Sequence, residues 1–363
     1  MKKSRAKSPR RNPKKYQRHL KALVVISLCA VVTAVIYFPA PRVSAPAATE
    51  AQSMADPSKA EAPTIESQDP LLISAIRAKT YPGSSITTIQ SLGDQSGFTN
   101  SVVTYQSDGL KIRALMSIPD GAAPAGGWPV IIFNHGYIDP ARYSTTGSEY
   151  AQFISTLARG GYVVIKPDYR GHGQSEGVPT GGHFSPAYTY DELNLIASVK
   201  QDIRFDTSRI GLVGHSLGGH TVLRTVVVSQ DVKASVVLAG VVGSFSDIFY
   251  NWPNSPMPGD LPAVVQTIKR DYIAKYGDPR MNPVFWDGAS AVTFVKDIRG
   301  PIQVNHSLGD STVPAVFSDH LVSAMRSAGK TVDYVTYRGD DHQFAINRMA
   351  VLQNMLSFFK SNL

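Results

Sequence analysis

One short stretch, Gly214-His215-Ser216-Leu217-Gly218, constrains the fold of this 363-residue chain more than any other. The apolar run Ile210 to Val213 before it predicts a strand, and apolar residues after it recur at helical spacing. A G-x-S-x-G pattern between a strand and a helix is typical of a sharp turn that lifts the serine hydroxyl above a sheet. The glycines are needed because the backbone is strained there and the two arms pass closely. We therefore predict that Ser216 is a nucleophile.

The apolar pattern on both sides of this motif predicts strands that alternate with helices. The expected strands are 86–89, 101–107, 110–118, 130–133, 162–165, 210–213, 234–239, 302–304 and 332–337, and the expected helices are 71–79, 150–157, 190–199, 316–325 and 345–359. Such alternation implies parallel crossovers and a doubly wound, mostly parallel sheet. Asp108-Gly109 predicts a hairpin that adds antiparallel strands at one edge. The expected fold class is α/β.

Residues 244–299 interrupt this alternation and predict a small helical cap inserted between two core strands. The segment is rich in proline and in aromatic residues, among them Phe249, Trp252 and Trp286. These aromatic side chains could line a substrate pocket beside the serine. They could equally form the small core of the insertion itself, and the sequence leaves both interpretations open.

A serine hydroxyl needs a base within hydrogen-bond reach, and that base needs an orienting acid. For this kind of turn, the expected order along the chain is serine, then acid, then histidine. Asp310 follows the expected strand 302–304, and His342 lies in the loop before the last helix. We therefore predict a catalytic triad of Ser216, His342 and Asp310. Asp340 or Asp341 could orient His342 instead.

The tetrahedral intermediate of such a reaction needs two donors for its oxyanion. One is the backbone N–H of Leu217, the residue after the nucleophile. The second is expected from the loop after strand 130–133, where we choose the N–H of Tyr137. His135 in the same loop is interpreted as a structural residue.

The basic residues are concentrated at the N-terminus. Residues 1–21 hold ten Lys and Arg and no acidic residue, so the remainder carries 26 basic and 28 acidic residues and nucleic-acid binding is not expected. Residues 22–38 form an uncharged, mostly apolar run, which predicts a membrane anchor with the rest of the chain outside the cytoplasm. The alternative is a secretory signal cleaved after Val43-Ser44-Ala45. Residues 39–70 predict a disordered linker, and 71–363 the folded domain.

Together these motifs resemble the α/β-hydrolase superfamily, and specifically the catalytic domain of the prolyl oligopeptidase-like serine hydrolases. The motifs are His135 to Tyr137, Asp168 to Ser175, Gly214 to Gly219, Gly309 to Pro314 and Asp341-His342. The resemblance covers roughly residues 101–360 and implies hydrolysis of an ester or a short peptide through an acyl-enzyme. It also implies a structural role for Asp168 and Arg170. The β-propeller that usually precedes such peptidase domains does not fit in the roughly 100 residues available, which favours esters.

Other functions remain open. The chain could be a serine-type peptidase, an inactive member of the fold that serves as a surface binding module, or an enzyme similar to haloperoxidases or dienelactone hydrolases. A serine at position 216 disfavours the dienelactone hydrolase alternative, which would need a cysteine. The sequence holds no metal-ligand cluster, dinucleotide-binding glycine motif or P-loop, so neither a metal nor a cofactor is expected.

Overall fold

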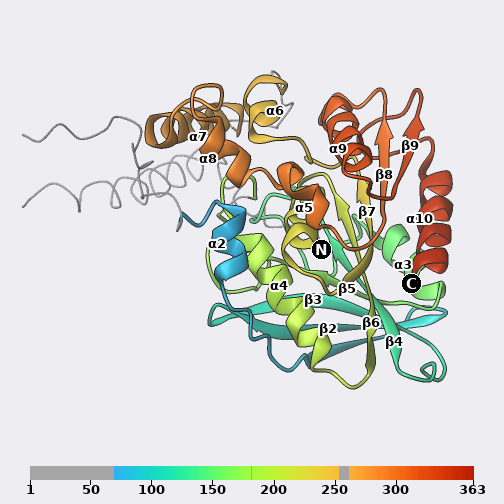
Figure 1. Ribbon diagram of the computed structural model, residues 1–363. Coiled ribbons are helices and arrows are strands. Elements are labelled where there is room, and N and C mark those ends of the chain that lie inside the picture. Colours follow the sequence, from blue (N-terminus) through green and yellow to red (C-terminus); the bar gives the residue numbers. More distant parts are fainter. Residues whose placement is uncertain (1–68, 181, 253–260) are drawn as a thin grey trace, which may run out of the picture. The chain divides into compact units, whose positions relative to one another are not determined.

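The computed structural model describes residues 69–180, 182–252 and 261–363. Within them the chain forms a nine-stranded sheet in the order β1-β2-β3-β5-β4-β6-β7-β8-β9 (Figure 1). The strands are β1 (Thr87–Asp94), β2 (Phe98–Ser107), β3 (Leu110–Pro119), β4 (Trp128–Asn134), β5 (Val163–Pro167), β6 (Phe205–His215), β7 (Val232–Leu238), β8 (Ile302–Ser307) and β9 (Val332–Tyr337). Strands β5, β4, β6, β7, β8 and β9 run parallel to one another. The prediction of a mostly parallel sheet is thus confirmed.

The antiparallel part of the sheet is built by the predicted hairpin. Strands β2 and β3 pair in register from Phe98 with Pro119 to Ser107 with Leu110. At the turn, Asp108 and Gly109 have φ angles of 52° and 78°, a left-handed pair of conformations that suits these two residue types. Strand β3 also pairs antiparallel with β5, which joins the hairpin to the parallel strands.

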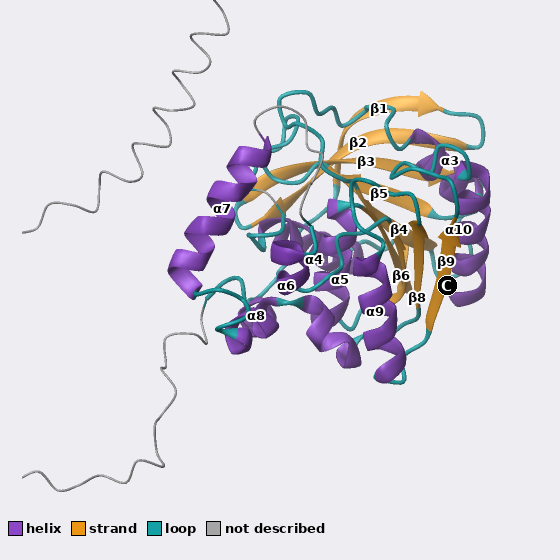
Figure 2. Cartoon of the chain, turned by 90° about the horizontal axis from the view of Figure 1, so that it is seen from above, coloured by secondary structure: helices purple, strands orange, loops and turns teal. Residues whose placement is uncertain are grey.

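Helices cover both faces of the sheet (Figure 2). They are α2 (Ile73–Ala78), α3 (Ala151–Arg159), α4 (Ala187–Lys200), α5 (Leu217–Val228), α6 (Phe245–Tyr250), α7 (Leu261–Tyr276), α8 (Pro283–Ala289), α9 (Val316–Ser327), α10 (Arg348–Asn362) and the 3-10 helix η2 (Ala291–Asp297). Buried residues of α2, α4, α5 and α9 share one hydrophobic core. Those of α3 and α10 form the core on the opposite face.

Strand β4 shows why the central strands are apolar throughout. Val130 and Ile132 belong to one core, Ile131 and Phe133 to the other, and all four are fully buried. Because successive side chains of a strand point to opposite faces, a strand covered on both faces loses the alternation of polar and apolar residues. The continuous apolar run in the sequence reflects this double coverage.

Helices α6, α7, α8 and η2 lie between β7 and β8, within the residues 244–299 for which the sequence predicts an insertion. Their aromatic side chains pack against one another. Trp286 is 1% exposed, its ring lies 5.3 Å from that of Phe285, and its indole N–H donates to the carbonyl of Gly277 at 2.9 Å. These side chains belong to a small core, which also includes Leu71, Leu72, Val241, Val313 and Phe317 from outside the insertion.

The last helix begins later than its apolar pattern predicts, at Arg348 instead of Ala345. The carboxylate of Asp340 accepts hydrogen bonds from the backbone N–H groups of Ile346 (3.0 Å) and Asn347 (2.8 Å). These bonds hold residues 340–347 as a loop. Ile346 is 76% exposed, so its apolar side chain is not evidence for a buried helical face.

The predicted basic segment 1–21, the membrane segment 22–38 and the linker 39–70 lie outside the described residues, apart from the last two linker positions. None of the helices described in the structure combines the length and hydrophobicity needed to cross a bilayer.

Candidate active site

Ser216 lies at the turn between β6 and α5, where the sequence predicts a strained backbone. Its φ and ψ are 54° and −117°, values that residues with a side chain rarely adopt. A Cβ on Gly214 would collide with the backbone of Gly218, and one on Gly218 would collide with the carbonyl of Asn134. Both glycines are therefore required for the helix to start so close to the strand. The Ser216 side chain lies at the carboxyl end of β6, in front of the first turn of α5.

The predicted base and acid lie in the loops that follow β9 and β8. Nδ1 of His342 is 2.7 Å from Oδ2 of Asp310. The side chain of Asp310 is completely buried and that of His342 is 11% exposed. Because the carboxyl ends of β6, β8 and β9 meet at the same edge of the parallel sheet, the fold brings all three loops together.

The surroundings of Asp310 keep its carboxylate ionised. Oδ1 accepts the backbone N–H groups of Thr312 (2.8 Å) and Val313 (2.9 Å), and Nε2 of His306 lies 3.3 Å from Oδ2. Burial alone would raise the pKa of Asp310, but the hydrogen bonds from His306 and His342 outweigh it and hold that pKa well below its usual range. His306 was not among the predicted site residues. It lies on β8, four positions before Asp310, and no motif marks it.

The alternative acids bond within their own loop. Asp340 accepts from backbone N–H groups of residues 341, 346 and 347, and Asp341 accepts from those of Gln343 (2.9 Å) and Ala345 (3.1 Å). Asp310 is therefore the carboxylate that the structure brings to His342.

The two predicted oxyanion donors lie on either side of Ser216. Leu217 opens helix α5, and Tyr137 follows Gly136, which is so close to the nucleophile that a Cβ there would lie 3.2 Å from Ser216 Cβ. Within the described part of the chain, neither the N–H of Leu217 nor that of Tyr137 donates to a protein acceptor. Both donors are available for an oxyanion.

A buried hydrogen-bonded chain links the oxyanion loop to the loop of the base. The N–H of Gly136 donates to the Tyr150 hydroxyl (2.9 Å), which lies 2.9 Å from Nδ1 of His215. Nε2 of His215 lies 3.0 Å from the carbonyl oxygen of His342. Burial lowers the pKa of His215 to about 3, so its ring is neutral, and the carbonyl assigns the proton to Nε2. Tyr150 was not predicted from the sequence, because no local pattern marks it.

The residues interpreted as structural hold neighbouring loops. Nδ1 of His135 lies 2.7 Å from the carbonyl oxygen of Gly136, and its ring is 4.4 Å from that of Tyr169. Arg170 pairs with the buried Asp191 at 2.7 Å, and the carboxylate of Asp168 accepts the Tyr143 hydroxyl at 3.0 Å.

The three predicted pocket residues differ in their surroundings. Trp286 lies inside the small core of the insertion, which corresponds to the second of the two interpretations above. Trp252 donates its indole N–H to the carbonyl of Thr312 at 2.7 Å and so braces the loop that carries Asp310. Phe249 is partly exposed and lies 5.8 Å from the ring of Phe184.

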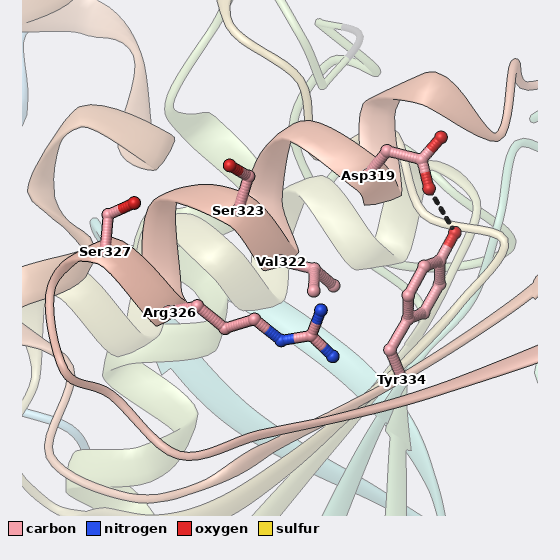
Figure 3. Close-up of a pocket in the computed structure, with 6 residues that line it drawn as sticks. All are labelled: Asp319, Val322, Ser323, Arg326, Ser327 and Tyr334. Carbon is pink, nitrogen blue, oxygen red and sulfur yellow. Dashed lines mark hydrogen bonds between the residues drawn. The ribbon is translucent and has the colours of Figure 1, made fainter.

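A surface hollow of about 350 Å³ lies beside α9 and β9, away from these residues (Figure 3). Its lining residues are Asp319, Val322, Ser323, Arg326, Ser327 and Tyr334, and the Tyr334 hydroxyl donates to Asp319 at 2.7 Å. None of the predicted site residues lines it. The described residues also contain no group of three or more metal-ligating side chains.

Comparisons with known proteins show the family of this chain. Residues 130–354 match the model of the alpha/beta hydrolase family. Protein ABHD12B of Homo sapiens is 24% identical over 221 residues, which are 59% of this chain and 54% of that protein.

Solved structures with the same fold include both esterases and peptidases. Acetyl xylan esterase 1 from Thermoanaerobacterium sp. JW/SL YS485 matches with a TM-score of 0.58 and 20% identity, over 78% of this chain and 89% of the esterase. The acylaminoacyl peptidase of Pyrococcus horikoshii matches with a TM-score of 0.57 and 19% identity, over 74% of this chain and 42% of the peptidase. This chain is a member of the alpha/beta hydrolase family.

Proposed function

We propose that this enzyme is a serine hydrolase that cleaves carboxylic esters or short peptides through an acyl-enzyme at Ser216. The observation that carries the proposal is the 2.7 Å hydrogen bond between Nδ1 of His342 and Oδ2 of Asp310, in loops that adjoin the turn of Ser216. A neutral imidazole whose Nδ1–H donates to a buried carboxylate presents a basic Nε2 for the serine proton.

The reaction then follows from the groups around Ser216. As Ser216 Oγ attacks the carbonyl carbon, Nε2 of His342 takes its proton, and the ionised Asp310 stabilises the imidazolium that forms. The N–H groups of Leu217 and Tyr137 donate to the oxyanion. When the intermediate collapses, His342 returns the proton to the departing alcohol or amine. Water then attacks the acyl-enzyme, with His342 again taking the proton. When the second intermediate collapses, the carboxylic acid is released and His342 returns the proton to Ser216 Oγ.

Esters are the preferred substrates in this proposal. The chain spans 89% of the acetyl xylan esterase that shares its fold but 42% of the acylaminoacyl peptidase. Because most of the esterase is matched, this likeness supports an ester substrate. A serine-type peptidase is the second candidate, because the peptidase shares the same catalytic fold.

The substrate class is tested by kcat/KM for p-nitrophenyl acetate, butyrate, hexanoate and octanoate beside alanyl and prolyl naphthylamides. We expect esters to be preferred, with a graded dependence on chain length, because each buried methylene is worth roughly 1 kcal/mol. Amides preferred by tenfold or more would identify a peptidase. No turnover of any ester or amide by the folded protein would favour the inactive binding module.

We also propose that residues 22–38 anchor the enzyme in the cell membrane and that its catalytic domain faces outward. Support comes from the ten basic residues before an uncharged apolar run, since basic flanks are retained on the cytoplasmic side. Secretion after cleavage of the same segment is the alternative.

A further inference from the structure

Four basic side chains gather on α5, on α7 and in the loop before α4. We call His183, His220, Arg224 and Lys269 the basic cluster. His220 and Arg224 are four residues apart within α5, so their side chains follow one another on the same face of the helix, which begins directly after Ser216. At 1.5 Å per residue, positions 220 and 224 lie about 6 Å and about 12 Å along the helix axis from Ser216.

Arg224 is a buried cation whose hydrogen bonds to described residues all go to carbonyl groups. Its residue is completely buried, and its guanidinium donates to the carbonyl oxygens of Ser185 (3.0 Å), His183 (3.2 Å) and Gly182 (3.4 Å). In the described part of the chain its Nε–H has no acceptor. Burial lowers the pKa of Arg224 to about 10, which still leaves it charged near neutral pH.

Lys269 of α7 is a second buried cation. It is 7% exposed, and its Nζ lies 5.8 Å from the centroid of the Phe249 ring. Burial lowers the pKa of Lys269 as well. Across the residues that the structure describes, neither Lys269 nor Arg224 forms an ion pair with a carboxylate.

The two histidines complete the cluster and point unpaired atoms into it. Their rings are 5.0 Å apart, and the described residues offer no hydrogen-bond partner to the buried Nδ1 of His183 or Nε2 of His220. Lys269 reaches this region through Phe249, whose ring lies 5.8 Å from that of Phe184, the chain neighbour of His183. Burial, with the positive charges of Arg224 and Lys269, lowers the pKa of His183 to about 3. The other nitrogen of His220, Nδ1, lies 3.1 Å from the carbonyl oxygen of Val241.

Two buried cations without a carboxylate partner among the described residues are energetically costly, because buried charges in proteins are normally paired. Arg224 has a structural role, since it holds residues 182–185 over α5. That role does not account for Lys269, which comes from a different part of the chain, nor for the unpaired Nε–H of Arg224 and histidine nitrogens. An anion supplied by a ligand would pair with Lys269 and would accept the Nε–H of Arg224.

We propose that the basic cluster binds a carboxylate of the substrate, so that the enzyme selects esters carrying a negative charge one to two helical turns from the scissile carbonyl. The inference rests on the proposed serine hydrolase function and names its substrate class: half-esters of dicarboxylic acids and similar anionic esters. The carboxylate enters between Lys269 and Arg224, while the ester carbonyl reaches Ser216.

The test compares each p-nitrophenyl half-ester of succinic, glutaric and adipic acid with its neutral methyl ester, which has nearly the same shape. For the wild-type enzyme we expect kcat/KM to be at least tenfold higher for the half-ester of the best chain length. Lys269→Gln should reduce this ratio by about tenfold. Arg270→Gln removes an exposed cation from the same helix and should retain the wild-type ratio and rates.

Arg224→Met completes the series, and its folding is checked by circular dichroism because Arg224 holds residues 182–185. The anionic subsite would be overturned if the wild-type enzyme had nearly the same kcat/KM for the half-ester and its methyl ester. It would also be overturned if Lys269→Gln left the ratio of these two kcat/KM values unchanged. A ratio reduced equally by Arg270→Gln would overturn it too, since general surface charge would then be the cause. Hydrolysis of the neutral esters shows that the proposed function holds even when the subsite fails, whereas loss of all ester hydrolysis contradicts the function itself.

Discussion

At the scale of single residues, the choice of acid is decided by where each carboxylate finds its donors. Asp310 is buried and meets His342, His306 and two backbone N–H groups, whereas Asp341 is exposed and bonds within its own loop. The motif around Ser216 and the order of elements predicted Ser216, Asp310 and His342. The pattern favoured Asp310 but left Asp340 and Asp341 open, because the choice depends on a contact between two loops 32 residues apart.

Replacing the acid tests this assignment. Asp310→Asn should lower kcat by about 10³-fold or more, because the amide favours the wrong tautomer of His342. Asp341→Asn removes only hydrogen bonds within a loop and should retain most of the activity. The measurement is kcat for a p-nitrophenyl ester. A larger loss in Asp341→Asn would show that Asp341 orients the base.

Tyr150 is a positioning residue, since its hydroxyl connects Gly136 beside the oxyanion donor to His215, which bonds the backbone of His342. In Tyr150→Phe both buried groups lose their partner, at a cost of about 1–3 kcal/mol of stability. We expect kcat to fall about tenfold with little change in KM, because the transition-state contacts are displaced more than ground-state binding.

Tyr162→Phe is the matched control, since Tyr162 is a buried tyrosine on the same face of the sheet. It should retain the wild-type kcat. Equal kcat values in Tyr150→Phe and the wild-type enzyme would show that the hydroxyl has no positioning role.

Among the helices and strands, the sequence predicted those features that neighbouring residues determine. It did not predict features that depend on contacts between residues farther apart. The hairpin β2–β3 was predictable because Asp108 and Gly109 determine their own turn. The start of α10 was not, because Asp340 holds the preceding residues by side-chain bonds that no periodicity reveals. The order of the parallel strands also depends on crossovers and not on residue patterns within any strand.

Glu192 joins three elements through buried hydrogen bonds. From α4 its carboxylate accepts the amide N–H of Asn134 on β4 (2.6 Å) and the hydroxyl of Thr225 on α5 (2.7 Å). Burial raises the pKa of Glu192 from 4.5 to about 7, although these hydrogen bonds act in the opposite direction. Because the oxyanion loop follows Asn134, the hydrogen bond from Asn134 to Glu192 helps to hold that loop in position.

The raised pKa predicts a pH-dependent stability. The folded protein retains a proton that the unfolded chain releases, so this contribution is complete below pH 4.5 and is lost as the pH rises through about 7. We compare the free energy of unfolding of Glu192→Gln with that of the wild type, by urea unfolding at pH 5 and pH 8. The difference should favour the variant more at pH 8 than at pH 5. Glu149→Gln, which removes an exposed carboxylate, is the control. An identical stability difference at both pH values would contradict the prediction.

At the scale of the whole molecule, the described residues account for the hydrolase domain, and the N-terminal residues 1–68 lie outside them. The proposed anchor predicts that the full-length chain fractionates with membranes. A truncated protein that begins near Gln68 should be soluble and active, because the site lies entirely within the described part of the chain. Native protein found free in the medium and starting near Ala45 or Ala47 would show a cleaved signal instead.

The central claim is that Ser216 is an activated nucleophile, and labelling with a fluorophosphonate followed by mass spectrometry tests it most directly. The wild-type enzyme should acquire one adduct, on Ser216, and Ser216→Ala should acquire none. His342→Ala should react about 10³-fold more slowly, because the hydroxyl has lost its base. If the folded wild-type enzyme remains unlabelled, or if Ser216→Ala is labelled at the wild-type rate, Ser216 is not the activated nucleophile.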